Sequence, residues 1–236
     1  MTRYTIIALL SLLHLSFGSD NAQSTIQAIL DDKKIPAKVV QTQDLGHNLR
    51  AIIVEHTQNG DRIMLFSTQD GSVLFDIGEI MWSNDNAFLT KLIQSKSQFE
   101  QEQKAKIDSK ALKLFETYQA QTITFKAKKP TSNTLYIISD PMCPYCLKEL
   151  EKLSSRLESH NVKMLVVGFL SEDSLKKASE ILAQKSGDEG KNLALLKKIY
   201  DKNYKPKDSQ NQQVLEISKA VAQSGVHSVP YIIESN

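Results

Sequence analysis

The sequence predicts a two-part α/β protein, in which a small α+β domain and a long helix precede a larger α/β domain. Two turn dipeptides, Asn59-Gly60 and Asp70-Gly71, separate short apolar runs in the first third of the chain. Residues 86–118 contain neither glycine nor proline, as a long helix requires. Two further apolar runs, Leu135–Ser139 and Val162–Leu170, flank a helical pattern, and this arrangement is typical of a parallel strand pair.

The composition is that of an ordinary globular chain. The 236 residues are 41% hydrophobic and 24% charged, and their formal net charge is +2. This length fits one large domain or two small ones. Lysine and arginine form no obvious stripe, so we expect no nucleic-acid partner.

The N-terminus has the pattern of a secretory signal peptide. Arg3 precedes an apolar run from Ile6 to Leu15 that is too short to span a membrane. Small residues occupy both positions that determine cleavage before residue 19, so we expect residues 1–18 to be removed after Gly18, with Ala22 as an alternative position. An uncleaved signal anchor is the other interpretation. Export would bring the chain into a compartment where disulfides form and persist.

Residues 19–84 are predicted to form the small domain. A helix over residues 24–33, with Ser24 as its N-cap, comes first. Four short strands are expected after it: Ala37–Gln41, Leu49–His56, Arg62–Ser67 and Ser72–Phe75. A domain of about 60 residues has a limited core, and an outer strand edge is a natural pairing surface. We therefore expect this domain to dimerise, with an independent small domain as the alternative.

Residues 85–120 are predicted to be a linker helix, centred on the helix-compatible stretch Asn86–Tyr118. Apolar residues lie at both ends of this stretch, whereas Gln94–Lys106 is almost wholly polar. A helix that is polar all round in its centre usually bridges two domains through solvent. A break near Ile107–Ser109 is equally allowed by the sequence.

Residues 121–236 are predicted to form the larger α/β domain. A first strand is expected at Ile123–Lys126, ahead of the strand–helix–strand unit, whose helix is expected at Cys146–Glu158. Residues 171–224 read as a helical insertion, with Gly225 at the C′ position of its last helix. The chain then enters a final strand.

Cys143 and Cys146 are the only two cysteines, and they stand three positions apart where the strand meets the helix. Thiols at this spacing can close and reopen a small disulfide ring. A thiol is nucleophilic as its thiolate, and a helix N-terminus directs unpaired N–H groups at the Cys143 sulfur. Pro144 fits the first helical position. We therefore predict Cys143 as the attacking thiol and Cys146, one turn further on, as the resolving thiol.

Asp140 lies three residues before Cys143, and two roles are open for it: a proton relay, or the cap of the helix. Two other interpretations of the cysteine pair are weaker. A zinc site needs about four ligands, and the sequence holds no second Cys-x-x-Cys. A structural disulfide closing so small a loop removes little unfolded-state entropy. We expect no metal and no cofactor beyond the redox-active disulfide itself.

The segment Ser139-Asp-Pro-Met-Cys-Pro-Tyr-Cys146 resembles the thioredoxin fold and, more narrowly, the exported Dsb oxidoreductases and isomerases of the DsbC/DsbG type. Residues 60–78 resemble their N-terminal dimerisation domain, and Asn86–Tyr118 resembles their linker helix. The likeness is greatest to the dimeric Dsb proteins of the Helicobacter and Campylobacter group. It implies a periplasmic homodimer, in which a cystatin-like α+β dimerisation domain precedes a thioredoxin-like catalytic domain with a helical insertion.

The resemblance also implies a substrate-binding surface made by Val229, Pro230, Pro144 and Tyr145. Pro230 would be the cis-proline beside the dithiol, and the Val229 backbone would pair with an extended substrate strand next to Cys143. An ordinary trans proline is the alternative. Two features depart from the family pattern. Valine stands at position 229, as in DsbA, where DsbC and DsbG have threonine. The chain ends six residues after Pro230, so the last strand and helix of a usual thioredoxin domain are expected to be missing or truncated.

These expectations define a function: an exported thiol–disulfide oxidoreductase that introduces or reshuffles disulfides through Cys143 and Cys146. Its expected partners are unfolded or misoxidised exported proteins, a membrane redox partner that resets the dithiol, and a second copy of the chain. The domain architecture favours an isomerase, whereas the Val229-Pro230 dipeptide favours an oxidase. The alternatives are a periplasmic chaperone with a non-essential thiol pair and a reductase for cytochrome c maturation.

Overall fold

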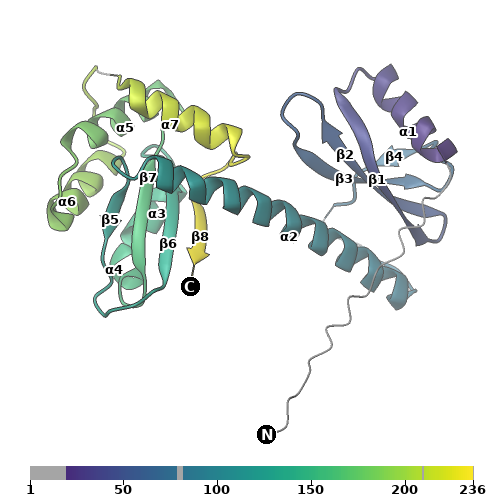
Figure 1. Ribbon diagram of the computed structural model, residues 1–236, viewed down its shortest axis with the longest axis horizontal. Helices are drawn as coiled ribbons and strands as arrows, with labels where there is room; N and C mark the ends of the chain where they lie inside the picture. The colour runs from purple at the N-terminus through teal and green to yellow at the C-terminus, as the bar shows by residue number, and fades with distance from the viewer. Residues whose placement is uncertain (1–19, 79–81, 209, 236) are drawn as a thin grey trace, which may run out of the picture. The chain divides into compact units, whose positions relative to one another are not determined.

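The computed structural model describes residues 20–78, 82–208 and 210–235. The described residues form two compact units, and the division between them falls after Gln103, within one long helix (Figure 1). The expected signal peptide, residues 1–18, lies outside the described residues. Within the described ranges, every helix is too short or too polar to cross a membrane.

The first unit is a four-stranded antiparallel sheet with a helix on one face. Helix α1 (Asp20–Asp32) precedes strands β1 (Ala37–Gly46), β2 (Leu49–His56), β3 (Arg62–Thr68) and β4 (Leu74–Phe75), which lie in the order β1-β2-β3-β4. Ile26 and Leu30 of α1 pack on Ile52 at the centre of one face. On the opposite face, Phe66 packs with Leu92 of helix α2 (Asn86–Thr117).

Both turn glycines of the first unit adopt the positive φ that tight turns favour, +73° at Gly60 and +77° at Gly71.

Two expectations for this unit were wrong. The first strand runs on to Gly46 instead of ending at residue 41, because the chain reverses only at the next two residues. Ser24 is not the N-cap of α1, since the helix begins at Asp20 and already buries Ala22.

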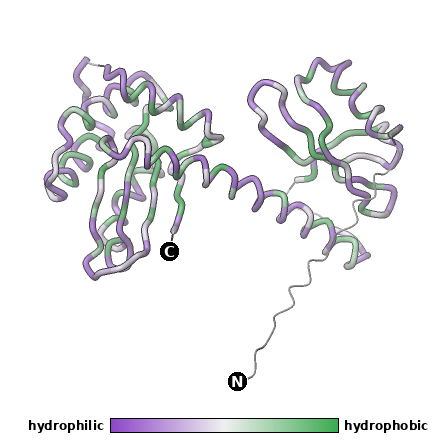
Figure 2. Tube along the Cα trace, viewed as in Figure 1, coloured by the Kyte–Doolittle hydropathy of each residue, from purple (hydrophilic) through white to green (hydrophobic). Residues whose placement is uncertain are grey.

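Helix α2 is continuous, so the alternative with a break near residues 107–109 was wrong. Asp85 caps its start, since the Asp85 carboxylate accepts the backbone N–H of Ala87 at 2.9 Å. An i,i+4 ion pair of 2.6 Å between Lys104 and Asp108 bridges two of its turns. Figure 2 shows that hydrophilic residues predominate in the middle of this helix.

The second unit contains the expected strand–helix–strand arrangement. Its sheet has the order β5-β7-β6-β8, with β5 (Ile123–Phe125), β6 (Thr134–Ser139), β7 (Asn161–Val166) and β8 (Tyr231–Ser235). Strands β6 and β7 are parallel, whereas β5 and β8 run antiparallel to their neighbours. Helices α3 (Pro144–Glu151) and α4 (Leu153–Arg156) connect β6 to β7, so the single helix expected there is interrupted at Lys152.

Helices cover both faces of this sheet (Figure 1). Three of them form the insertion between β7 and β8: α5 (Glu172–Gln184), α6 (Glu189–Tyr200) and α7 (Gln212–Gln223). One core joins α3, α4, α5 and α6 to the sheet around Ile137 and Met164. The other core joins α7 and the last turns of α2 to the sheet around Leu165. Gly225 follows α7 with a φ of +96°, as expected for a C′ residue.

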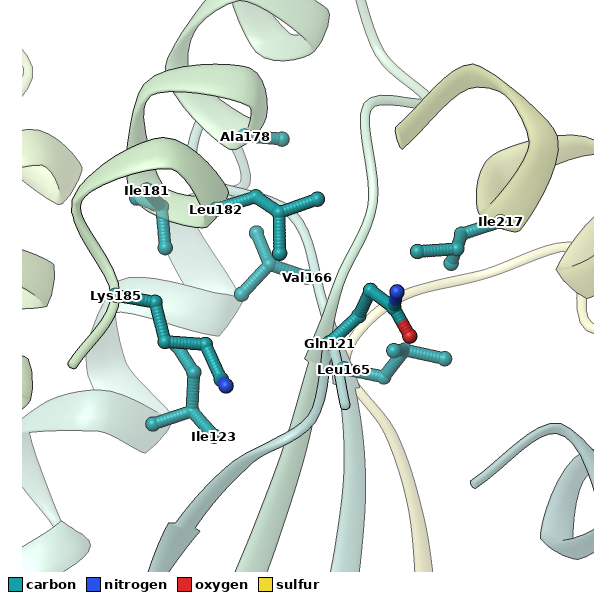
Figure 3. Close-up of a pocket in the computed structure, with 9 residues that line it drawn as sticks. All are labelled: Gln121, Ile123, Leu165, Val166, Ala178, Ile181, Leu182, Lys185 and Ile217. Carbon is teal, nitrogen blue, oxygen red and sulfur yellow. The ribbon is translucent and has the colours of Figure 1, made fainter. Parts of the chain in front are cut away.

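A small cavity lies inside the second unit, between the sheet and helices α5 and α7. Figure 3 shows it surrounded mainly by aliphatic side chains such as Ile123, Leu182 and Ile217, with the amide of Gln121 and the amine of Lys185 nearby. Its volume of about 10 Å³ leaves room for no more than one water molecule. This cavity is therefore a packing feature of the core, and the cysteines lie elsewhere.

Candidate active site

The first cysteine lies where strand β6 passes into helix α3. Cys143 is the N-cap residue, with an extended backbone (φ −82°, ψ 119°), and Pro144 follows in the first helical turn. The backbone N–H of Cys143 donates to the Asp140 carbonyl at 3.1 Å, which closes the turn before the helix. The Cys143 sulfur thus stands at the positive end of the α3 dipole, where negative charge on it is favoured.

The second cysteine lies one turn deeper. Cys146 is 1% exposed, against 6% for Cys143, and its sulfur accepts the backbone N–H of Asp140 at 3.3 Å. Burial, as the largest cause, raises the pKa of the Cys146 thiol to about 12. The two thiols are therefore unequal: Cys143 is the less deeply buried of the two, and Cys146 is held behind it in its protonated form.

The loop between α7 and β8 brings Val229 and Pro230 to the dithiol. The Val229–Pro230 peptide bond is cis. The Cys143 thiol donates to the Val229 carbonyl oxygen at 3.3 Å, across 86 positions of the sequence. Tyr145, between the two cysteines, is 67% exposed, and the Lys148 amine lies 5.5 Å from the centroid of its ring. The structure thus brings the sequence-predicted site residues together around Cys143.

An open groove of about 470 Å³ runs beside Cys143. It is lined by the loop after β7, the last turn of α7 and the loop before β8, namely Cys143, Phe169, Leu170, Ala222, Val226, His227, Ser228 and Val229. Phe169 and Leu170 were missed as site residues because the sequence assigned them to strand β7, which ends at Val166. Gly168 was the available sign in the sequence that the strand ends before Phe169. A Cβ at this position would lie 2.5 Å from the Leu175 Cα, and only glycine allows this approach.

Asp140 holds this loop in place. Its buried carboxylate accepts the backbone N–H groups of Met142 at 2.8 Å, Phe169 at 2.6 Å and Leu170 at 3.2 Å. It also accepts the hydroxyl of Ser174. The expectation that Asp140 caps α3 was wrong, because Cys143 is the N-cap residue and α3 has no side-chain cap bond. The Asp140 carboxylate instead bonds to Met142 ahead of the helix, to the loop after β7 and to the first turn of α5. None of these four bonds reaches a cysteine sulfur, and the proton-relay role of Asp140 stays a prediction.

A second buried hydrogen bond lies under the dithiol. The Tyr200 hydroxyl, at the end of α6, donates to the Ser139 hydroxyl at 2.8 Å, and both residues are buried. Hydrogen bonding from the Ser139 hydroxyl acts to lower the pKa of Cys146, against the larger effect of burial. Sequence reasoning missed both residues, because Tyr200 is 61 positions from Ser139 and no local pattern pairs them.

Metal ligands do not gather in the part of the chain that the structure describes: no three His, Cys, Asp or Glu side chains are close enough together to hold a metal ion. Two of the histidines instead meet carboxylates. His47 lies 2.8 Å from Asp85, and His160 lies 2.9 Å from Glu234.

The fold and the dithiol define a thioredoxin-like protein with a helical insertion and an N-terminal α+β domain. Residues 23–112 match the family model described as disulfide isomerase DsbG N-terminal. The whole fold is similar to that of Helicobacter pylori DsbG, with a TM-score of 0.51 and 24% identity over 92% of this chain and 100% of that chain. The predicted resemblance to DsbC/DsbG-like proteins and the predicted fold class are both confirmed.

Two further solved structures are similar to parts of the chain. A periplasmic thioredoxin-like protein from Salmonella enterica serovar Typhimurium is 23% identical, with a TM-score of 0.40 over 49% of this chain and 79% of that chain. The catalytic domain of Proteus mirabilis ScsC is 17% identical, with a TM-score of 0.41 over 52% of this chain and 85% of that chain. A comparison with curated proteins found no match.

Proposed function

We propose that this protein is an exported thiol–disulfide oxidoreductase that introduces or reshuffles disulfide bonds in periplasmic proteins through Cys143 and Cys146. One observation carries the proposal: the Cys143 sulfur stands at the N-terminus of α3, with Cys146 one turn behind it and the Val229 carbonyl oxygen 3.3 Å away. The match of residues 23–112 to the DsbG N-terminal family supports the same function.

In the oxidising direction, the protein starts with a Cys143–Cys146 disulfide. A client thiolate attacks the Cys143 sulfur, a client–Cys143 disulfide forms, and Cys146 leaves as a thiolate that takes up a proton. A second client thiolate then attacks the client sulfur of this mixed disulfide. The client gains a disulfide, Cys143 leaves as a thiolate, and the dithiol has received the two electrons. A membrane redox partner removes these electrons and restores the disulfide.

In the reshuffling direction, the protein starts with both cysteines reduced. The Cys143 thiolate attacks a wrong client disulfide, and one client sulfur leaves as a thiolate that is free to find its correct partner. Cys146 provides the escape from a stalled intermediate: it loses its proton, its thiolate attacks the Cys143 sulfur, and the client is released as a thiolate. The burial of Cys146 keeps this second attack slow enough for the client to rearrange.

The client segment lies along the loop that precedes β8. The Val229 backbone pairs with an extended client strand, in the manner of strand addition to a sheet edge. Pro144 and the exposed Tyr145 flank that strand from the α3 side, and the groove beside Phe169 and Leu170 receives an apolar client side chain. Clients that are unfolded or misoxidised fit this surface, because only they present extended backbone and apolar side chains together.

The rest of the chain delivers this site to its clients. Residues 1–18 direct export and are then removed, residues 19–84 form a homodimer, and residues 85–120 link that dimer to the catalytic domain at 121–236. The long strand β1 is an edge of the first unit's described sheet, and Ile63 and Val73 expose apolar surface on the same unit. A small domain of this kind gains stability by pairing with a second copy.

The test uses the purified chain with reduced RNase, scrambled RNase and insulin as separate substrates. Wild-type protein is expected to oxidise the first or reshuffle the second, and Cys143→Ala is expected to abolish both activities. Cys146→Ala is the matched variant: it keeps the attacking thiol, so it accumulates a client mixed disulfide that is visible on a non-reducing gel. If wild type leaves all three substrates unchanged, or if Cys143→Ala acts like wild type, the proposal is wrong.

The chaperone alternative has its own readout in the same experiment. A non-catalytic binding protein would suppress aggregation of a client equally well after both cysteines are replaced by alanine. The reductase alternative predicts rapid insulin reduction with little RNase oxidation, and an equilibrium constant with glutathione typical of a reducing dithiol.

A further inference from the structure

The buried side chains of Tyr200 and Ser139 form a short polar line that leads to Cys146, the deeper cysteine of the dithiol. Ser139 is the last residue of β6, Tyr200 is the last residue of α6, and Cys146 lies in the first turn of α3. The Tyr200 and Ser139 oxygens are 2.8 Å apart, and the three residues are between 1% and 2% exposed. A buried tyrosine hydroxyl without a hydrogen-bond partner costs free energy, and the Tyr200 hydroxyl avoids this cost by bonding to Ser139.

The direction of these hydrogen bonds follows from the number of protons available. Tyr200 has one hydroxyl proton, and it donates that proton to the Ser139 oxygen. The Ser139 oxygen is then an acceptor on that side, so its own proton is free to point elsewhere. Ser139 directly precedes Asp140, whose backbone N–H donates to the Cys146 sulfur at 3.3 Å, so the end of β6 lies against that sulfur. Hydrogen bonding from the Ser139 side chain acts to lower the pKa of Cys146, which agrees with this placement. The line therefore runs in one direction, from Tyr200 through Ser139 to the sulfur.

We propose that Tyr200 and Ser139 are positioning residues that stabilise the thiolate of the resolving cysteine, Cys146, by directing a hydroxyl proton at its sulfur. This proposal rests on the proposed function, because only a protein that opens and closes the disulfide needs that thiolate. It adds two residues to the reaction that neither the Cys-x-x-Cys motif nor the proline loop contains.

The thiolate of Cys146 occurs in both directions of the exchange. When a client opens the disulfide, the Cys143–Cys146 bond breaks and the electron pair stays on the Cys146 sulfur. When Cys146 resolves a mixed disulfide, it first loses its proton to water, and its electron pair then forms the new bond to Cys143 while the client sulfur leaves. A hydroxyl donor accelerates the first step by stabilising the leaving group, and it accelerates the second by increasing the thiolate fraction.

The groups around Cys146 explain why its thiolate needs a hydrogen-bond donor. Burial is the main cause that raises the pKa of Cys146, and the neighbouring Cys143 thiol raises it further. The Asp140 backbone N–H opposes this increase from the loop after β6. From α6, burial raises the pKa of Tyr200 well above its ordinary value, so its hydroxyl stays a donor throughout the working range. From α5, Lys177 directs its amine to the Asp201 carbonyl at 2.9 Å.

The experiment separates the attack of Cys143 from the resolution by Cys146. Reduced protein is mixed with an aromatic disulfide reagent that releases a coloured thiolate. The first release reports the attack of Cys143 on the reagent, and the second reports the attack of Cys146 on the Cys143 adduct. Both rates are recorded between pH 6 and pH 10 for wild type, Tyr200→Phe, Ser139→Ala and Ser139→Thr. The range of about four pH units brackets the pKa of a free cysteine.

Tyr200→Phe and Ser139→Ala are expected to slow the second release about tenfold near neutral pH, which corresponds to a hydrogen bond to a charged group. The first release and the circular dichroism spectrum are expected to stay at wild-type values. Ser139→Thr keeps the hydroxyl and is expected to keep the wild-type second rate. Tyr204→Phe is the matched control: its hydroxyl bonds to Glu180 at 2.6 Å, so its removal is expected to leave both releases unchanged.

Two different results would overturn the role proposed for Tyr200 and Ser139. Suppose that wild type releases two equivalents of coloured thiolate and that Tyr200→Phe and Ser139→Ala keep the wild-type rate of the second release. The role proposed for Tyr200 and Ser139 is then wrong, while the proposed function stands. If wild type releases only one equivalent of coloured thiolate, the disulfide between Cys143 and Cys146 does not form. The proposed function then fails together with the role proposed for Tyr200 and Ser139. A loss of both releases in Ser139→Ala alone would indicate a folding defect and count against a specific role, unless Tyr200→Phe slows only the second release.

Discussion

The Asp140 carboxylate lies 2.6 Å from the backbone nitrogen of Phe169, although 29 positions of sequence separate them. This bond ties the turn that precedes Cys143 to the loop that follows β7. The same carboxylate reaches Met142 on one side and Ser174 on the other. One buried side chain therefore aligns the start of α3, the wall of the groove and the start of α5.

Replacement of Asp140 by asparagine is expected to destabilise the protein. The carboxylate accepts four hydrogen bonds, whereas an amide would place its own N–H₂ against donors, so about 1–3 kcal/mol of unfolding free energy should be lost. Urea unfolding of the reduced protein would measure this loss. Asp188→Asn is the control, because Asp188 caps α6 and asparagine is an equally good N-cap. Equal stability of both variants would contradict the role given to Asp140.

Cys146 is expected to make the stability of the reduced protein depend on alkaline pH. Its pKa is raised from 9.0 to about 12 in the folded state, chiefly by burial. The folded state thus holds this proton more tightly than the unfolded state, so the contribution is fully present below pH 9 and is lost as the pH rises toward 12. Unfolding of reduced wild type and reduced Cys146→Ala, compared between these limits, would measure it. Parallel curves for the two proteins would show that Cys146 contributes nothing.

Two turn glycines of the first unit are expected to differ in their tolerance of alanine. Both have a positive φ, but a Cβ at Gly71 would lie 2.7 Å from the Ala22 carbonyl oxygen, whereas a Cβ at Gly60 would meet nothing within 4 Å. Gly60→Ala should therefore cost about 1 kcal/mol of unfolding free energy from backbone strain alone. Gly71→Ala should cost clearly more, because α1 would have to move. Thermal unfolding of the two variants measures the difference, and equal losses would contradict the packing of α1 on this turn.

Much of the fold follows from local signals. The alternation of apolar residues and the glycine turns located β2 and β3 closely, since strand period and positive φ are properties of a few adjacent residues. An element boundary was wrong where a local pattern fits two structures, as at the end of β7. The apolar run through Phe169 and Leu170 reads as a strand, but the loop there bonds to Asp140, which no neighbouring residue supplies.

The sequence by itself located the dithiol: two cysteines at this spacing, with a proline between them at the head of a helix, predict one attacking and one resolving sulfur. It also determined the class of fold. Only the tertiary structure decided what surrounds those sulfurs, from Val229 at Cys143 to Tyr200 and Ser139 beneath Cys146. The physical reason is that a helix dipole and a three-residue spacing act within one turn of chain. The burial of Cys146 and the hydrogen bonds around it come instead from segments that are far apart in sequence and meet only when the sheet and its helices pack.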